Sequence, residues 1–110
     1  MPKYLLQVNY NQTGIQGVLK EGGTARREAI RQAAESIGGT LDAFYFAFGD
    51  VDAYCILDLP SNVIALEASL IGNAPGSVKV RYTVLATPEE VDEAAAAARA
   101  GMDAYRPPGQ

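Results

Sequence analysis

The chain has 110 residues, with 9 lysines and arginines against 13 aspartates and glutamates, so its formal net charge is −4. This length suits one domain with a modest core, and the acidic balance argues against a nucleic-acid binder. The chain has no histidine and a single cysteine, Cys55, which excludes an intramolecular disulfide, a Cys/His zinc site and a histidine-activated nucleophile.

Alternating apolar residues predict strands, and apolar residues at helical spacing predict helices. In chain order they give a strand over residues 3–10, a short helical piece near 13–19, a helix over 24–37, strands over 40–48 and 51–59, a helix over 63–71, a strand over 77–86 and a helix over 87–101. This order is typical of the α+β, ferredoxin-like βαββαβ fold with a C-terminal helix added. We predict a four-stranded antiparallel sheet with the strand order 4-1-3-2.

Capping residues set the predicted helix starts. Thr13 and Thr24 are the expected N-caps of the first two helical segments, and Ser61 or Asn62 caps the third. The stretch TPEE (residues 87–90) combines an N-cap, proline at the first helical position and a capping-box glutamate. It is the clearest helix start in the chain.

The stretch AFGDVDAY (residues 47–54) predicts the register of the central hairpin. Gly49 and Asp50 match a two-residue type II′ turn, in which Gly49 has a positive φ. In this register Tyr45 pairs with Tyr54. The predicted core face holds Phe44, Phe46 and Phe48 opposite Val51, Ala53, Cys55 and Leu57.

The other face of the predicted sheet mixes tyrosines and Ile56 with polar side chains. A monomer would expose these apolar groups to water, whereas a second copy packed sheet against sheet would cover them. We therefore expect a homodimer, or a higher homo-oligomer, that forms a dimeric α+β barrel with a small cavity between the two sheets.

The candidate ligand-binding residues on this face are Asn9, Tyr45, Asp52, Tyr54 and Arg81. Apolar walls with a few convergent polar groups are the usual form of a small-molecule site. If chemistry occurs there, Asp52 is the best candidate for a catalytic general base, since burial can raise the pKa of a carboxyl group. The simpler interpretation is a hydrogen-bonded dimer interface without a ligand.

A second candidate is an anion site at the helix start over residues 22–27, which includes Arg26 and Arg27. A helix N-terminus attracts anions, and arginine can form bidentate contacts with a carboxylate or phosphate. The apolar stripe of this helix consists of Ile30, Ala33, Ala34 and Ile37. Both arginines are predicted to lie largely outside that stripe, so the alternative is that they form surface ion pairs with nearby acids.

Asp50 and Asp52 stand two residues apart, which raises the question of a metal site. A Ca²⁺ loop needs several more oxygen ligands at fixed spacing, and this stretch does not supply them. We interpret Asp50 as a turn residue and expect no metal and no cofactor.

Two stretches carry a family resemblance: KEGGTARR (residues 20–27), and AFYFAFGD (residues 43–50) followed by Asp52. Together with the opening PKY they resemble the GYD-domain family, over about residues 2–93. The resemblance implies a dimeric α+β barrel of a small bacterial protein and no settled activity. Gly49 and Asp52 match the Gly, Tyr, Asp signature of the family, whereas Val51 occupies its tyrosine position.

We expect one domain over residues 1–104, a flexible tail over 105–110 and a cytoplasmic location, with no long apolar run for a leader or a membrane span. The favoured hypothesis is a homo-oligomer that binds a small molecule, with an anion as one option, in the cavity between the sheets and that contacts neither membrane nor nucleic acid. One alternative is an enzyme without a cofactor that uses Asp52 and a tyrosine on a carbonyl or polar-aromatic substrate. Another is a structural or assembly module.

Overall fold

A four-stranded antiparallel sheet forms the centre of the protein, whose computed structural model describes residues 1–110. Its strands are β1 (Lys3–Tyr10), β2 (Thr40–Phe46), β3 (Ala53–Asp58) and β4 (Val78–Leu85). They lie in the order β2-β3-β1-β4, and every neighbouring pair is antiparallel. This confirms the predicted ferredoxin-like α+β fold and its strand order.

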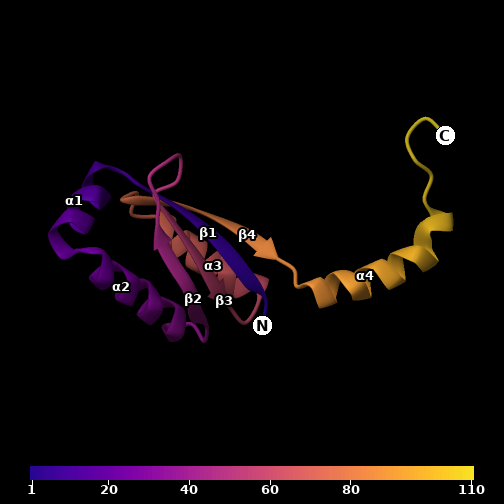
Figure 1. Ribbon diagram of the computed structural model, residues 1–110, viewed down its shortest axis with the longest axis horizontal. Coiled ribbons are helices and arrows are strands. Elements are labelled where there is room, and N and C mark those ends of the chain that lie inside the picture. Colours follow the sequence, from indigo (N-terminus) through magenta and orange to yellow (C-terminus); the bar gives the residue numbers. More distant parts are fainter.

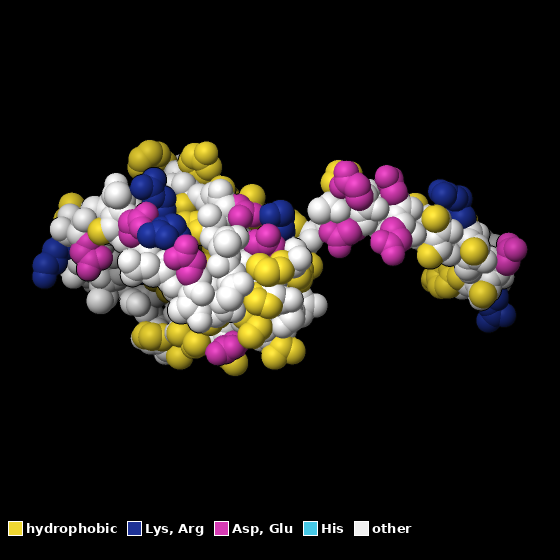
Figure 2. Space-filling model, turned by 90° about the horizontal axis from the view of Figure 1, so that it is seen from below, with side chains coloured by type: hydrophobic (Ala, Val, Ile, Leu, Met, Phe, Trp, Pro, Cys, Tyr) yellow, Lys and Arg dark blue, Asp and Glu magenta, His cyan; other side chains and the backbone are white.

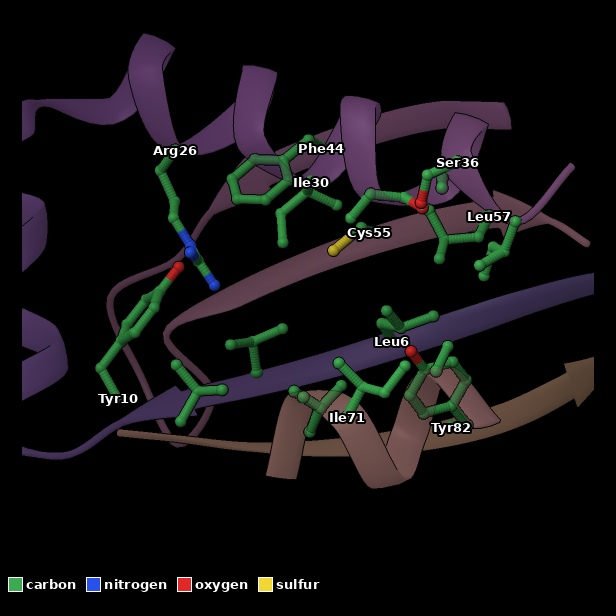
Figure 3. A pocket seen from close by; sticks show the side chains of 18 residues that line it. Leu6, Tyr10, Arg26, Ile30, Ser36, Phe44, Cys55, Leu57, Ile71 and Tyr82 are labelled. Carbon is green, nitrogen blue, oxygen red and sulfur yellow. The ribbon is translucent and has the colours of Figure 1, made fainter. Parts of the chain in front are cut away.

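The helices are α1 (Gln12–Glu21), α2 (Gly23–Ser36), α3 (Asn62–Asn73) and α4 (Pro88–Gly101), and a 3₁₀ turn over Met102–Ala104 follows α4. Helices α2 and α3 lie on one face of the sheet, which leaves the opposite face open (Figures 1 and 3). Helix α4 projects away from the body beyond the end of β4 (Figure 1). None of the helices combines the length and the apolar character needed to cross a bilayer.

Two of the predicted helix caps are wrong. Helix α1 is capped by Asn11, whose side-chain oxygen accepts a hydrogen bond from the Gly14 N–H. Helix α2 starts directly after Gly22, at a φ of 86°, and has no side-chain cap. A glycine at positive φ lets the chain turn from one helix into the next, so Thr24 already lies inside α2.

The other two helix starts follow the sequence. Ser61 accepts a hydrogen bond from the Ile64 N–H and is the cap of α3. At α4, Thr87 and Glu90 form the complete capping box, with each side chain bonded to the backbone N–H of the other residue. The reciprocal bonds satisfy two N–H groups that a helix leaves without partners.

The core lies between the sheet and the two helices. Its buried side chains are Tyr4, Leu6, Val8, Ala34, Ala53, Cys55, Leu57, Leu59 and Ala65. Alternate residues of β1 and β3 point into it, as expected when one face of a strand is covered. The predicted core positions on β3 are confirmed.

The loop of the hairpin differs from the predicted two-residue turn. Strand β2 ends at Phe46 and β3 begins at Ala53, and Gly49 is not among the glycines with positive φ. The wider loop leaves Phe48 fully exposed, outside the core to which it was assigned, while Val51 is buried. The register within the strands is nevertheless as predicted, with Tyr45 opposite Tyr54.

Candidate functional site

One row of side chains crosses the open face of all four strands. Tyr45 pairs with Tyr54, Tyr54 with Gln7, and Gln7 with Arg81. The Arg81 guanidinium donates to the Gln7 side-chain oxygen over 2.7 Å, and Tyr45 keeps 72% of its surface exposed. The structure therefore brings together three of the five candidate ligand-binding residues, and Gln7, which was expected on this face but not among those candidates, is a fourth member.

The remaining two predicted residues tie the hairpin to β1. The Asp52 side chain accepts a hydrogen bond from the Tyr10 N–H at 2.9 Å, and the Asp52 N–H is shared by the Val8 carbonyl and the Asn9 side-chain oxygen. These bonds close the end of the sheet. Asp52 thus has a structural task, because its carboxylate pairs with a backbone donor that would otherwise lack a partner.

A cavity of about 190 Å³ lies beneath the helices, between α2, α3 and the core face of the sheet (Figure 3). Most of its walls are apolar, and they include Leu6, Val8, Ile30, Ile37, Phe44, Leu57, Ala68, Val78 and Val80. Pockets for drug-sized molecules are larger, roughly 300–1,000 Å³, so this cavity suits a small ligand. The sequence did not predict it, since it depends on how far apart the two helices sit.

Arg26 and Tyr10 form the polar end of the cavity. Figure 3 shows Arg26 reaching down from α2 so that its guanidinium lies beside the Tyr10 phenol, while Ser36 lies at the far end. The guanidinium carbon is 5.9 Å from the centre of the Tyr10 ring. The buried Arg26 Nε and Tyr10 Oη have no hydrogen-bond partner, and Arg26 forms no ion pair.

The spacing along α2 explains why this arginine points inward. Arg26 precedes Ile30 by four residues and Ala33 by seven, so it continues the buried side of the helix by one turn. The prediction that Arg26 lies outside the apolar stripe is therefore wrong. Arg27 is different: it is half-exposed and lies 3.9 Å from the Glu28 carboxylate.

Burial changes the pKa values of the groups around the cavity. It raises the pKa of Tyr10, and the positive charge of Arg26 opposes this shift. Burial also raises the pKa of the Cys55 thiol to about 11 and that of Tyr82 to about 12. At neutral pH these three groups are uncharged, so Arg26 is the only charged side chain that lines the cavity.

A second, more polar hollow adjoins this end of the cavity. It is lined by Thr13, Gly14 and Gly17 of α1 and by Ser77, and it shares Tyr10 and Arg26 with the apolar cavity. The Tyr10–Arg26 pair therefore stands between an apolar chamber and a polar opening. Glu21 also lines this hollow, so the hollow holds one charge of each sign, whereas the apolar cavity holds only that of Arg26.

These features define a ferredoxin-like α+β domain with an open sheet face and an apolar cavity whose only charged side chain is Arg26. The family model of the GYD domain matches residues 4–95, and the chain belongs to this family. Searches of the curated proteins and of the solved structures found no match. The matched range includes the hairpin loop, in which Asp52 binds the Tyr10 N–H and Val51 is buried.

Proposed function

We propose that this GYD-domain protein binds a small anion with an apolar body, with the anionic group at Arg26 and the body inside the cavity beneath the helices. The observation that supports this most directly is Arg26 at the end of an apolar chamber, with no acidic partner and with a buried Nε that lacks a hydrogen-bond partner. A partly buried charge without a partner costs free energy, and an anionic ligand would remove that cost.

The polar end offers the donors that a carboxylate needs. The guanidinium supplies several N–H groups in a planar fork, and the raised pKa of Tyr10 keeps its phenol protonated as an O–H donor. The apolar walls then favour a hydrocarbon or aromatic body over water. Asp52 is already engaged by the Tyr10 N–H, so the geometry favours binding over the alternative of a reaction with Asp52 as base.

Replacing Arg26 with methionine tests the anion site. Methionine retains the apolar stem and removes the charge, so the fold should persist. We expect the native chain to bind octanoate more tightly than 1-octanol, by about ten- to hundredfold, because a hydrogen bond to a charged group contributes about 1.5–3 kcal/mol. Arg26→Met should abolish that preference, as measured by isothermal titration calorimetry.

Arg27→Met is the matched control, because Arg27 is the next residue and lies outside the cavity. It should keep the preference of the native chain for octanoate. Equal binding of octanoate and octanol by the native chain, or an equal loss in both variants, would show that Arg26 does not hold an anion.

We further propose that the open face of the sheet mediates self-association, which would enclose a second cavity between two sheets. Below the row of Tyr45, Tyr54, Gln7 and Arg81, a second row places Ile56 and Leu5 side by side on the same face. The uncovered aromatic and aliphatic groups support an isologous contact with a second copy. In such a contact Arg81 and the tyrosines would line the space between the sheets.

Tyr54→Lys tests this contact, because it puts a charge at the centre of the open face. We expect the dissociation constant of the dimer to rise at least about tenfold, since a buried unpaired charge opposes association. Light scattering after size-exclusion chromatography measures the change. Leu19→Lys, at an exposed position of α1, should leave the dimer intact, and a native chain that is monomeric at micromolar concentration would contradict the proposal.

A further inference from the structure

The C-terminal arm, formed by α4 and residues 102–110, has no buried residue. It extends from the body and gives the chain a longest dimension of 58 Å against 32 and 24 Å in the other directions (Figure 1). Isolated helices of this length are marginally stable in water, even when they are rich in alanine. The arm therefore forms a complete helix that packs against no other part of the chain.

The arm carries an apolar stripe along one side. Its members are Val91, Ala95, Ala98, Met102 and Tyr105, which follow one another at spacings of four and three residues. This spacing places the helical members on one face, as in helices that pack on another helix. Val91, Met102 and Tyr105 are all exposed. The stripe runs about 16 Å from Val91 to Met102 at the rise of an α-helix.

Helix α3 exposes a second apolar stripe on the outside of the body. Val63, Leu66 and Leu70 have the spacing of one helix face, and 72%, 64% and 72% of their surfaces are exposed. They point away from the core, which α3 contacts through Ala65. Three large aliphatic side chains left in water on one short helix are unusual for a monomer and indicate an interaction surface.

The arm is unsuited to reach α3 of its own chain. Only Ala86 and Thr87 separate β4 from α4, and the capping box of Thr87 and Glu90 fixes how the helix starts. The helix continues away from the end of β4 (Figure 1). A return to the body would require the link to reverse and the capping box to break, which costs about 0.5–2 kcal/mol for the cap alone.

Charge favours a contact between the far half of the arm and α3. Figure 2 shows acidic side chains on the half of α4 next to the body, and basic ones, together with the acidic Asp103, beyond it. Arg99 lies in this far half, next to Ala98, and Glu67 is the only charged residue of α3. Attraction between Arg99 and Glu67 would favour one orientation and one register of the arm on α3.

We propose that the arm docks on α3 of a second copy of this chain, so that two copies exchange arms and each stripe covers the other. The exchange is reciprocal, as a two-fold contact requires. It uses the helical side of the domain and is independent of both the ligand cavity and the open sheet face. The GYD match ends at residue 95, so the far half of the arm is a feature of this chain outside the matched region.

Cross-linking between two variants, each with one introduced cysteine, tests the exchange. The native thiol, Cys55, is buried, so the introduced thiols react preferentially. A mixture of Leu66→Cys and Ala98→Cys chains, treated with a short bismaleimide, should give a covalent pair that contains one chain of each kind. Mass spectrometry identifies that pair, and circular dichroism verifies that both variants are folded.

Ala96→Cys is the matched control, since Ala96 lies on the opposite side of α4 from Ala98. It should cross-link to Leu66→Cys several-fold less than Ala98→Cys does. Equal yields from the two arm positions would overturn the proposal. A link within one chain of a variant that carries both Leu66→Cys and Ala98→Cys would also overturn it, because it indicates that the arm docks on its own body. A dominant product between two Ala98→Cys chains would overturn it as well, because it indicates that arm pairs with arm.

Discussion

Cys55 should react with iodoacetamide about a hundredfold more slowly in the folded chain than in the chain unfolded by urea, when both are measured at mildly alkaline pH. Burial raises the pKa of the thiol from 9.0 to about 11, and a shift of two units lowers the thiolate fraction about a hundredfold. The side chain is also 1% exposed, so limited access slows the reaction further. Mass spectrometry of samples quenched over time gives both rates.

The pH profile separates the effect of pKa from that of access. The rate for the unfolded chain should level off as pH passes 9, whereas that for the folded chain should keep rising toward pH 11. Octanoate bound in the cavity should slow the folded reaction again, because Cys55 lines that space. A folded rate within a few-fold of the unfolded one would show that the thiol is neither buried nor shifted.

Leu59→Ala should lower the free energy of unfolding by about 2–5 kcal/mol, the usual cost of removing a fully buried leucine side chain. Leu59 is 0% exposed and its N–H donates to the Pro2 carbonyl, so it fastens the end of β3 to the start of the chain. Its side chain lies where a Cβ on Gly39 would come within 2.6 Å. Urea unfolding followed by circular dichroism measures the loss.

Leu19→Ala removes the same atoms at a position on α1 that is 86% exposed. It should change the free energy of unfolding by less than about 0.5 kcal/mol, as surface substitutions commonly do. Similar denaturation midpoints for the two variants would mean that the contacts of Leu59 do not support the fold. Since a domain of this size has about 5–15 kcal/mol of stability, the difference is easily measured.

Two of the three proposed contacts, the anion at Arg26 and the arm on α3, begin from groups that the single chain leaves uncovered. Arg26 lacks an acidic partner inside the cavity, and the stripes of α3 and α4 lack apolar partners outside it. These two proposals are independent, because the cross-linking experiment requires no ligand and the octanoate titration requires no arm exchange. A negative result for the anion site therefore does not contradict the arm exchange, and the reverse also holds.

The inward position of the Arg26 side chain could not be predicted from the sequence. The sequence predicted that residues 22–27 could hold an anion and named Arg26, but it placed the side chain at the surface. A charged residue at the end of an apolar stripe is normally assigned to water, and α2 alone does not show otherwise. The gap between α2 and α3 creates the chamber into which Arg26 points.

The order of strands and helices, the register of Tyr45 with Tyr54 and the capped start of α4 could all be predicted from the sequence. They follow from alternation, helical spacing and capping residues, which act over a few neighbours along the chain. The strand order was then predicted from the topology that this order of elements usually adopts. The tertiary structure alone decided that Phe48 stays in solvent, that Asp52 closes the hairpin and that Arg26 enters an apolar cavity. Each depends on the distance and orientation of elements remote in sequence, and local patterns do not encode those quantities.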